Sequence, residues 1–315
     1  MLTIGTRGSE LALWQARHVQ ALLGGESAGV TLKIVKTSGD RLLEIPLQAQ
    51  LDKGFFTKEL EVELAAGTID LAVHSLKDLP TQLPQGLILA AIPQRAEVND
   101  VLLVHPRALD LTRALPVKAG ANVGTASMRR TALLRHVAAD VNPVLLRGNV
   151  PTRLNKAKTG ELDAVLLARA GLARLRLDPG ELAVFDLNPR LWLPAAAQGA
   201  LGIEIRENDE KARQALEKLH DPQAELAVNL ERGLLRKIEG GCHSPFGALA
   251  EILGDGTAIL RAGTTGRDGN WRAIRVEGDY NCLIENAFDL LMADNVPSNG
   301  SKEIVQWFSP ARSWS

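Results

Sequence analysis

The chain has 315 residues, with 36 Lys and Arg against 37 Asp and Glu, 45% apolar residues and two cysteines. Its length and composition predict two or three domains with apolar cores, and the lack of any uncharged apolar run of about 18 residues argues against a membrane span. Because the N-terminus is unlike a secretion signal and two cysteines cannot form a disulfide framework, we expect a cytoplasmic protein.

The charges are unevenly distributed. Residues 95–190 contain 12 Arg and 3 Lys against 9 Asp and Glu, a net charge of +6, so the rest of the chain carries −7 to give the total of −1. Aromatic residues make up only 4% of the sequence, which disfavours a nucleic-acid surface. The arginine-rich segment suggests a locally held anionic ligand, although uneven charge is also common in long chains.

The first part of the chain alternates strands and helices, as in sheets covered by helices. Ser9 and Thr57 are suitable helix caps, and glycines follow the expected helix ends. The expected strands are Leu2–Thr6, Val30–Thr37 and Ile69–His74, and the expected helices begin at Ser9 and Thr57 and end at Gly24 and Gly67.

The alternation restarts near residue 100. The expected strands are Asp100–Val104, Ala121–Thr125, Pro143–Leu146 and Asp163–Ala168, with helices at Ser127–Ala138, from Val150, and after Ala168. A strand at Leu201–Ile205 follows Leu-Pro-Ala-Ala-Ala-Gln-Gly-Ala, and we expect it to return the chain to the first domain.

After Asp221-Pro222, a helix start with proline at the first helical position, a helix is expected to about Lys237. Short strands at Ala258–Ala262 and Arg272–Val276 and a final helix follow. The predicted fold is α/β with three domains: two similar α/β domains with mainly parallel sheets flanking a cleft, resembling the two-lobed periplasmic-binding-protein architecture, and a small C-terminal α+β domain. The predicted domains are 1–95 with 195–217, 99–191, and 222–315.

Polar clusters follow the expected strands where helices begin. They are Arg7-Gly8-Ser9, Ser75-Leu76-Lys77-Asp78, Thr125 to Arg130, and Arg147-Gly148-Asn149 through Arg153. Open α/β sheets bind ligands at the carboxyl ends of their strands, and helix N-termini attract anions. One arginine alone would be a solvated surface charge, but arginines in several such loops predict a ligand with several anionic groups. These arginines are Arg7, Arg129, Arg130, Arg147 and Arg153.

Two residues stand out chemically. Asp78 is the one acid within this basic set; it is either an ion-pair partner or helix cap, or a carboxylate kept ionised by Lys77 to stabilise a cation formed during reaction. Cys242 follows two glycines, which leave its side chain accessible for covalent attachment, whereas Cys282 lies among apolar residues and is expected to pack. His243 either lowers the thiol pKa or lies on the surface. No metal-ligand spacing and no glycine-rich phosphate loop are present.

Six ordered motifs together resemble the porphobilinogen deaminase (hydroxymethylbilane synthase) family, from residue 3 to about residue 250. They are Thr6-Arg7-Gly8-Ser9 with Leu11-Ala-Leu-Trp-Gln-Ala, Lys53-Gly-Phe-Phe-Thr-Lys-Glu-Leu-Glu, Ala72-Val-His-Ser-Leu-Lys-Asp78, Val123-Gly-Thr-Ala-Ser-Met-Arg-Arg130, Leu146-Arg-Gly-Asn-Val-Pro-Thr-Arg153 and Glu239-Gly-Gly-Cys242.

The resemblance implies an enzyme that joins four porphobilinogen molecules head to tail with loss of ammonia and then releases the linear tetrapyrrole by hydrolysis. It implies a dipyrromethane cofactor bound to Cys242 by a thioether, with Asp78 near the pyrrole nitrogens. Implied cofactor contacts are Lys77, Thr125, Ser127, Arg129, Arg130, Arg147 and Gly148; implied substrate contacts are Arg7, Ser9, Lys53, Arg153, Arg174, Gln198 and Gly199. We expect a monomer that binds neither nucleic acid, membrane nor metal.

The sequence departs from the family pattern at three places. Asp52 stands where glycine is usual, in the segment Arg41–Phe55 that matches the family's mobile loop; Ala196-Ala197 replace a commoner glycine; and His243 differs from the usual apolar continuation. Two alternatives are weighed. A non-enzymatic two-lobed anion-binding protein would need neither Asp78 nor an accessible Cys242, and a nucleotide-handling transferase would need the missing phosphate loop.

Overall fold

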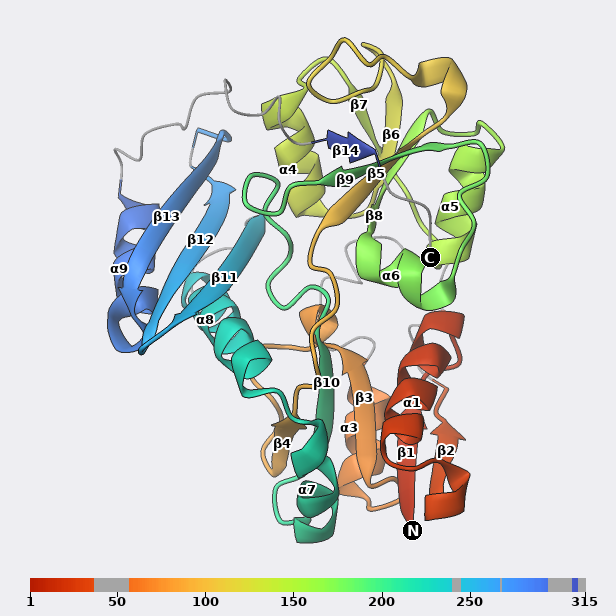
Figure 1. Cartoon of the computed structure of the whole chain (residues 1–315), viewed down its shortest axis with the longest axis vertical. Helices are drawn as coiled ribbons and strands as arrows, with labels where there is room; N and C mark the ends of the chain where they lie inside the picture. Colours follow the sequence, from red (N-terminus) through yellow and green to blue (C-terminus); the bar gives the residue numbers. More distant parts are fainter. Residues whose placement is uncertain (37–56, 240–244, 267, 294–307, 311–315) are drawn as a thin grey trace. The chain divides into compact units, whose positions relative to one another are not determined.

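The computed structural model describes residues 1–36, 57–239, 245–266, 268–293 and 308–310. The chain divides into two compact units, one of Met1–Ala96 with Gly199–Leu226 and the other of Glu97–Gln198 with Ala227–Ser315. Both units combine a sheet with helices (Figure 1), which confirms the α/β class. The division into three domains stays a prediction.

The first unit is built on a five-stranded sheet with the order β2-β1-β3-β10-β4, which can be followed in Figure 1. Its strands are β1 (Leu2–Thr6), β2 (Val30–Ile34), β3 (Leu71–Ser75), β4 (Leu87–Ala91) and β10 (Leu201–Arg206). β1 pairs in parallel with β2 and β3, whereas β10 is antiparallel to β3 and β4. The strand predicted at Leu201–Ile205 is therefore confirmed as β10, while β4 was not predicted.

Helices cover both faces of this sheet because its strands bury apolar side chains on each. The helical segments are α1 (Glu10–Leu22), α3 (Lys58–Ala65), α7 (Glu210–Leu216), η1 (Glu26–Ala28), η3 (Leu76–Asp78) and η5 (Glu217–Leu219). The Ser9 hydroxyl caps α1 by accepting the Ala12 amide at 3.3 Å, as predicted. The prediction that the Thr57 side chain caps α3 is wrong: it makes no capping bond, and its backbone is already helical.

The second unit contains a six-stranded sheet with the order β14-β9-β5-β8-β6-β7. Its strands are β5 (Asp100–Val104), β6 (Asn122–Thr125), β7 (Asn142–Leu145), β8 (Ala164–Ala168), β9 (Ala183–Leu187) and β14 (Phe308–Pro310), and its helical segments are η4 (Pro106–Ala108), α4 (Met128–Val137), α5 (Val150–Lys158) and α6 (Arg169–Leu175). β6 pairs in parallel with β7 and β8, whereas β5 is antiparallel to β8 and β9. β5 thus brings its amino end to the edge where β6, β7 and β8 have their carboxyl ends.

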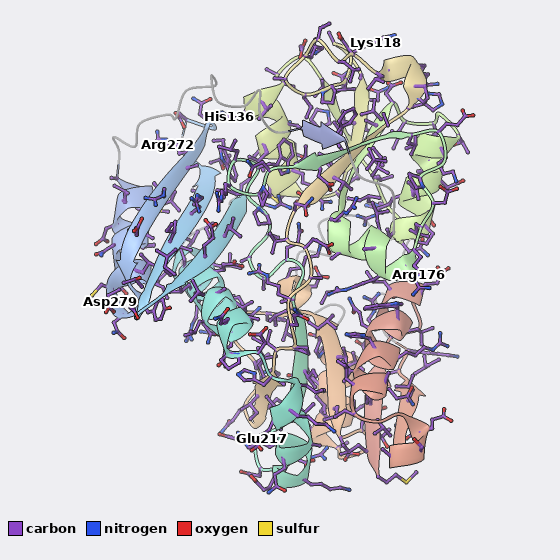
Figure 2. All side chains as sticks on the ribbon, viewed as in Figure 1. Lys118, His136, Arg176, Glu217, Arg272 and Asp279 are labelled. Atoms are coloured by element: carbon purple, nitrogen blue, oxygen red, sulfur yellow. The ribbon has the colours of Figure 1, made fainter. Side chains whose placement is uncertain are left out.

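The rest of the described chain forms a helix-covered antiparallel sheet. α8 (Pro222–Glu239) is followed by β11 (Phe246–Gly254), β12 (Thr257–Thr265), β13 (Trp271–Asp279) and α9 (Tyr280–Met292). Asp221 caps α8 by accepting the amides of Gln223 and Ala224. Arg272 lies near the start of β13 and Asp279 at its end (Figure 2), where the Asp279 carboxylate accepts the Asn281 amide and starts α9. The predicted strands near 258 and 272 are therefore confirmed, and both are longer than expected.

A strained turn lies at one of the positions where the sequence departs from the family pattern. Ala197 has a φ of 60°, in the left-handed region that costs a residue with a Cβ about 1 kcal/mol or more. Its amide donates to the buried Glu231 carboxylate at 2.7 Å, and the same carboxylate accepts the Ala250 amide at 3.0 Å. Glycine suits this position because of its backbone conformation, and Glu231 holds the turn in place.

We predict that Ala197→Gly stabilises the second unit by about 1 kcal/mol, because relief of the left-handed strain exceeds the added freedom of the unfolded chain. Urea unfolding followed by circular dichroism measures this difference. Ala196→Gly is the matched control, since Ala196 does not have a positive φ, and we expect it to destabilise. Equal effects of the two substitutions would contradict the assignment of strain to Ala197.

Candidate functional site

Four predicted loops occupy the carboxyl ends of parallel strands. In the first unit, Arg7, Ser9 and Asp78 line one cavity of about 100 Å³, together with Ser75 and His74. The loops after β1 and β3 thus meet, as expected for neighbouring parallel strands. Gln15 of α1 donates to the Ser75 hydroxyl at 2.7 Å and so ties the helix to the cavity wall.

Asp78 ends the short 3₁₀ helix that follows β3, and it is exposed. No hydrogen bond or ion pair engages its carboxylate within the part of the chain that the structure describes, so its alternative roles as ion-pair partner or cap find no counterpart there. Lys77, beside it, is half-buried. The carboxylate is available to a molecule that enters the cavity.

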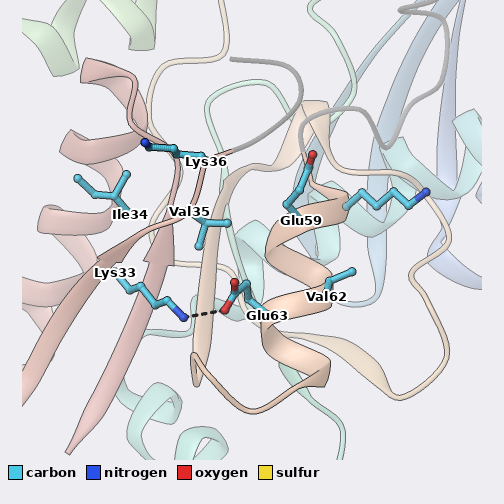
Figure 3. Close-up of a pocket in the computed structure, with 8 residues that line it drawn as sticks. Lys33, Ile34, Val35, Lys36, Glu59, Val62 and Glu63 are labelled. Carbon is cyan, nitrogen blue, oxygen red and sulfur yellow. Dashed lines mark hydrogen bonds and ion pairs between the residues drawn. The ribbon is translucent and has the colours of Figure 1, made fainter. Parts of the chain in front are cut away.

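A larger hollow of about 550 Å³ lies elsewhere on the same unit (Figure 3). Its lining includes Lys33, whose ammonium pairs with Glu63 at 2.7 Å, and the exposed side chains of Ile34 and Val62. None of the predicted site residues contributes to it. We therefore place the candidate site at the smaller Asp78 cavity.

The second unit presents two helix N-termini at the carboxyl ends of β6 and β7. Ser127 caps α4, and its own amide donates to the Thr125 hydroxyl at 3.1 Å. Asn149 caps α5, and Gly148 before it has a φ of 111° that favours glycine. Hydrogen bonds within the loops thus fix both helix starts, and their remaining amides favour an anion.

Arg129 and Arg130 converge on a carboxylate that sequence reasoning did not single out. Asp100, the first residue of β5, is fully buried and accepts from Arg129 Nη1 at 2.9 Å and from Arg130 Nη2 and Nε at 2.7 and 3.1 Å. Trp192 Nε1 and Gln198 Nε2 complete the set at 3.0 and 2.8 Å. Two guanidinium groups and one carboxylate leave a net charge of +1 at the start of α4.

This network fixes charge in the protein interior. Burial works against ionised Asp100, but the charges and hydrogen bonds of Arg129 and Arg130 prevail and hold its pKa well below the ordinary range. Burial likewise lowers the pKa of Arg129. Both arginines are only 5% exposed, so the expectation that they contact a ligand stays a prediction, whereas their contact with Asp100 is a finding.

The remaining predicted residues fall into two groups. Arg147 and Arg174 are half-buried; burial lowers the pKa of Arg174 to about 10, against the opposing charge of Glu97. Arg153 Nε donates to the Gly148 carbonyl at 2.7 Å, and Gly199, buried with a φ of 86°, accepts the Ala96 amide through its carbonyl. The predicted residues outside the described ranges are Lys53, Cys242, His243, Asp52 and the segment 41–55.

The described residues offer neither a metal site nor a membrane-spanning helix. Among the described residues, no group of three or more His, Cys, Asp or Glu side chains could hold a metal ion. No described helix has the length and apolar character needed to cross a membrane.

Asp100→Asn should destabilise the protein by about 3 to 5 kcal/mol at pH 7, because it leaves two buried guanidinium groups without their counter-charge. Folding lowers the pKa of Asp100. Its contribution to the free energy of unfolding is therefore complete above about pH 4, its pKa in the unfolded chain, and is lost as the pH falls below that value. Urea unfolding at pH 7 and pH 3.5 measures the free energy of unfolding, and the difference between Asp100→Asn and the wild type should be smaller at pH 3.5.

The matched control for this experiment is Asp140→Asn, which removes the partner of Arg113 at an exposed pair. We expect a much smaller change there, since solvent screens exposed charges. Equal losses of stability for the two substitutions would contradict the prediction that the buried Asp100 network stabilises the fold more than an exposed ion pair does.

Comparisons with known proteins agree on one family. A family model described as "Porphobilinogen deaminase, dipyromethane cofactor binding domain" matches residues 2–214, and one described as "Porphobilinogen deaminase, C-terminal domain" matches residues 225–290. A porphobilinogen deaminase of Nitratidesulfovibrio vulgaris is 43% identical over 96% of this chain and 98% of its own length. That of Nitratiruptor is 41% identical over 97% and 96%.

Among solved structures, a Salmonella typhimurium periplasmic binding protein is 14% identical and covers 72% of this chain and 96% of its own, with a TM-score of 0.40. An amino acid substrate-binding protein of Streptococcus pneumoniae is 15% identical over 75% and 92%, with a TM-score of 0.35. The family models and the relatives, which span nearly the whole chain, decide the assignment: this chain belongs to the porphobilinogen deaminase family.

Proposed function

We propose that this protein is a hydroxymethylbilane synthase, which condenses four porphobilinogen molecules head to tail with loss of ammonia and releases the linear tetrapyrrole by hydrolysis. The observation that carries the proposal is the Asp78 cavity, where an exposed carboxylate lines the same wall as Arg7 and Ser9. Each pyrrole bears an acetate and a propionate, so the cation and hydroxyl suit the side groups while the carboxylate faces the reacting centre.

Asp78 is proposed as the catalytic residue. Loss of ammonia from porphobilinogen leaves a positively charged pyrrole methylene, and a fixed carboxylate near developing positive charge lowers the barrier by electrostatic preorganisation. Because Asp78 follows a buried strand and lies in a short 3₁₀ helix, its backbone is held before substrate arrives. An anion-binding protein without catalytic activity would have no need for this carboxylate.

The donors of the second unit fit the dipyrromethane cofactor of the family, which is a polycarboxylate. We propose that Cys242 binds it through a thioether and that residues at the starts of α4 and α5 hold its carboxylates. These residues are Thr125, Ser127, Arg129, Arg130, Arg147 and Gly148. Lys77, which follows β3 in the first unit, is proposed as a further cofactor contact. When bound, the cofactor supplies the free pyrrole α-carbon from which the product chain is built. The net charge of +1 around Asp100 attracts such a ligand without leaving both arginines unpaired.

The other predicted contacts are proposed to bind the incoming pyrrole and the lengthening chain. They are Arg7, Ser9, Lys53, Arg153, Arg174, Gln198 and Gly199. Growth of the chain needs room, and the segment 41–55 is the proposed lid. We further propose a cytoplasmic monomer whose partner is this small-molecule substrate, with no nucleic acid or membrane involved.

Protein expressed in cells that make porphobilinogen should carry a mass adduct of two pyrrole units. Cys242→Ser should lose the adduct and the activity, because no other thiol occupies that position. Intact-mass spectrometry measures the adduct. The matched control is Cys282→Ser in α9, which should keep the adduct; the expectation that Cys282 packs is wrong, because this cysteine is exposed. Wild-type protein without an adduct and without porphobilinogen consumption would overturn the proposed function.

Asp78→Asn should keep the adduct but lower kcat at least about 100-fold, since removal of one preorganised electrostatic group costs about that factor. Porphobilinogen consumption at saturating substrate measures kcat, and the mass of the same sample shows cofactor loading. A loaded variant with near-normal turnover would remove Asp78 from the mechanism.

A further inference from the structure

Three ionisable side chains lie on one face of the sheet in the first unit: Glu61 of α3, His74 of β3 and Glu204 of β10. Alternate residues of a strand point to opposite faces. On the face that packs against α1, the apolar cluster contains Leu71, Val73, Ile203 and Ile205. His74 and Glu204 therefore lie on the other face, where Ala72 packs with α3 (Figure 1).

His74 and Glu204 form a buried pair. His74 Nε2 lies 3.0 Å from Glu204 Oε2, and the two side chains are 5% and 0% exposed. The register pairs His74 with Gly202 and Glu204 with Ala72, so the two side chains are diagonal neighbours across the strands. An interaction between residues 130 positions apart is thus fixed by sheet register.

The cluster has buried oxygens without hydrogen-bond partners. Glu204 Oε1 and Glu61 Oε1 both accept no bond within the described ranges. A buried carboxylate whose oxygen accepts no hydrogen bond is unfavourable when it is ionised. The free-energy cost is smaller when the carboxyl group shares a proton with a neighbouring side chain. Burial raises the pKa of Glu61; the Thr57 hydroxyl opposes this rise, and the charge of Glu204 adds to it.

The cluster adjoins the candidate active site. His74 lines the same cavity as Asp78, and Arg7 and Thr57 do so too. The charged and titratable groups around the cluster are Glu204 from β10, which pairs with His74, and Glu61 and Lys58 from α3. Asp78 and Arg7 line the same cavity as His74. An imidazole paired with a buried carboxylate can release and accept a proton, so proton exchange is a chemistry that these side chains can perform.

We propose that Glu61, His74 and Glu204 hold a proton behind the Asp78 cavity and that His74 exchanges it with the substrate in each condensation. This rests on the proposed function. His74 gives its proton to the amino group of porphobilinogen as the C–N bond breaks, so that ammonia leaves with the electron pair of that bond and the pyrrole methylene becomes a cation. After the new carbon–carbon bond forms, the pyrrole α-carbon gives its proton to His74, so the cluster returns to its starting charge. Glu61 and Glu204 are positioning residues for the imidazole.

The first test compares His74→Gln with a matched control in the same unit. His220 also pairs with a glutamate, Glu225, at 3.2 Å, but that pair is partly exposed, so His220→Gln removes a similar contact away from the cavity. We expect His74→Gln to lower kcat about 100-fold, the usual effect of losing a general acid–base group. We expect KM to stay within about twofold, one limb of the kcat–pH profile to disappear, and His220→Gln to retain wild-type values.

A second measurement does not depend on activity. Glu61→Gln should raise the melting temperature more at pH 8 than at pH 5. Because folding raises the pKa of Glu61, the contribution of this side chain to stability is complete below its pKa in the unfolded chain and is lost as the pH rises. An equal change in melting temperature at the two pH values would overturn the proposal.

The outcomes separate the two proposals. If wild-type protein carries no two-pyrrole adduct and consumes no porphobilinogen, the proposed function fails whatever His74 does. If the adduct and turnover are present and His74→Gln keeps the wild-type kcat and pH profile, only the proton-exchange role fails. Glu204→Gln distinguishes loss of chemistry from loss of folding, because it keeps the shape of the buried side chain; a normal pH profile in this variant would also count against the role.

Discussion

One buried carboxylate organises the arginine-bearing edge of the second unit. Asp100 begins a strand that runs against its neighbours, so it arrives at the edge where the loops after β6 and β7 emerge. There it bonds two guanidinium groups, an indole and an amide. The arrangement turns two arginines, which would repel each other if unpaired, into a rigid group with a net charge of +1.

Pairing with carboxylates also explains much of the positive charge in residues 95–190. The surplus of 12 Arg and 3 Lys over 9 acids in residues 95–190 suggested a concentrated anion site. In the described structure, at least six of those arginines pair with carboxylates; these are Arg107, Arg113, Arg129, Arg130, Arg169 and Arg190. Much of the positive charge therefore stabilises the fold, and the charge offered to a ligand is concentrated at a few loops and helix starts.

Local signals predicted much of the fold and of the candidate site. Ser9 and Ser127 cap helices as expected because a cap depends on residues within one turn. Loops after parallel strands meet at one edge of a sheet, so the sequence alone could group Arg7, Ser9 and Asp78, which line one cavity in the structure. Thr57 shows the limit: its sequence suits a cap, but its backbone is already helical.

What could not be predicted depends on long-range register. Asp100 meets Trp192 and Gln198 across more than 90 positions, and His74 meets Glu204 across 130. No spacing rule links such residues, because sheet order and strand direction bring them together. The strands β4 and β9 were not predicted for a related reason: each is a short segment that pairs with strands distant in the chain.

The central claim is that the chain builds a pyrrole polymer on Cys242. The most direct measurement mixes purified wild-type protein with a few equivalents of porphobilinogen and follows its intact mass over seconds. The account predicts a series of covalent species that differ by one pyrrole unit above the two-pyrrole adduct, and no such series for Cys242→Ser. A wild-type mass that stays constant while porphobilinogen is present would contradict it.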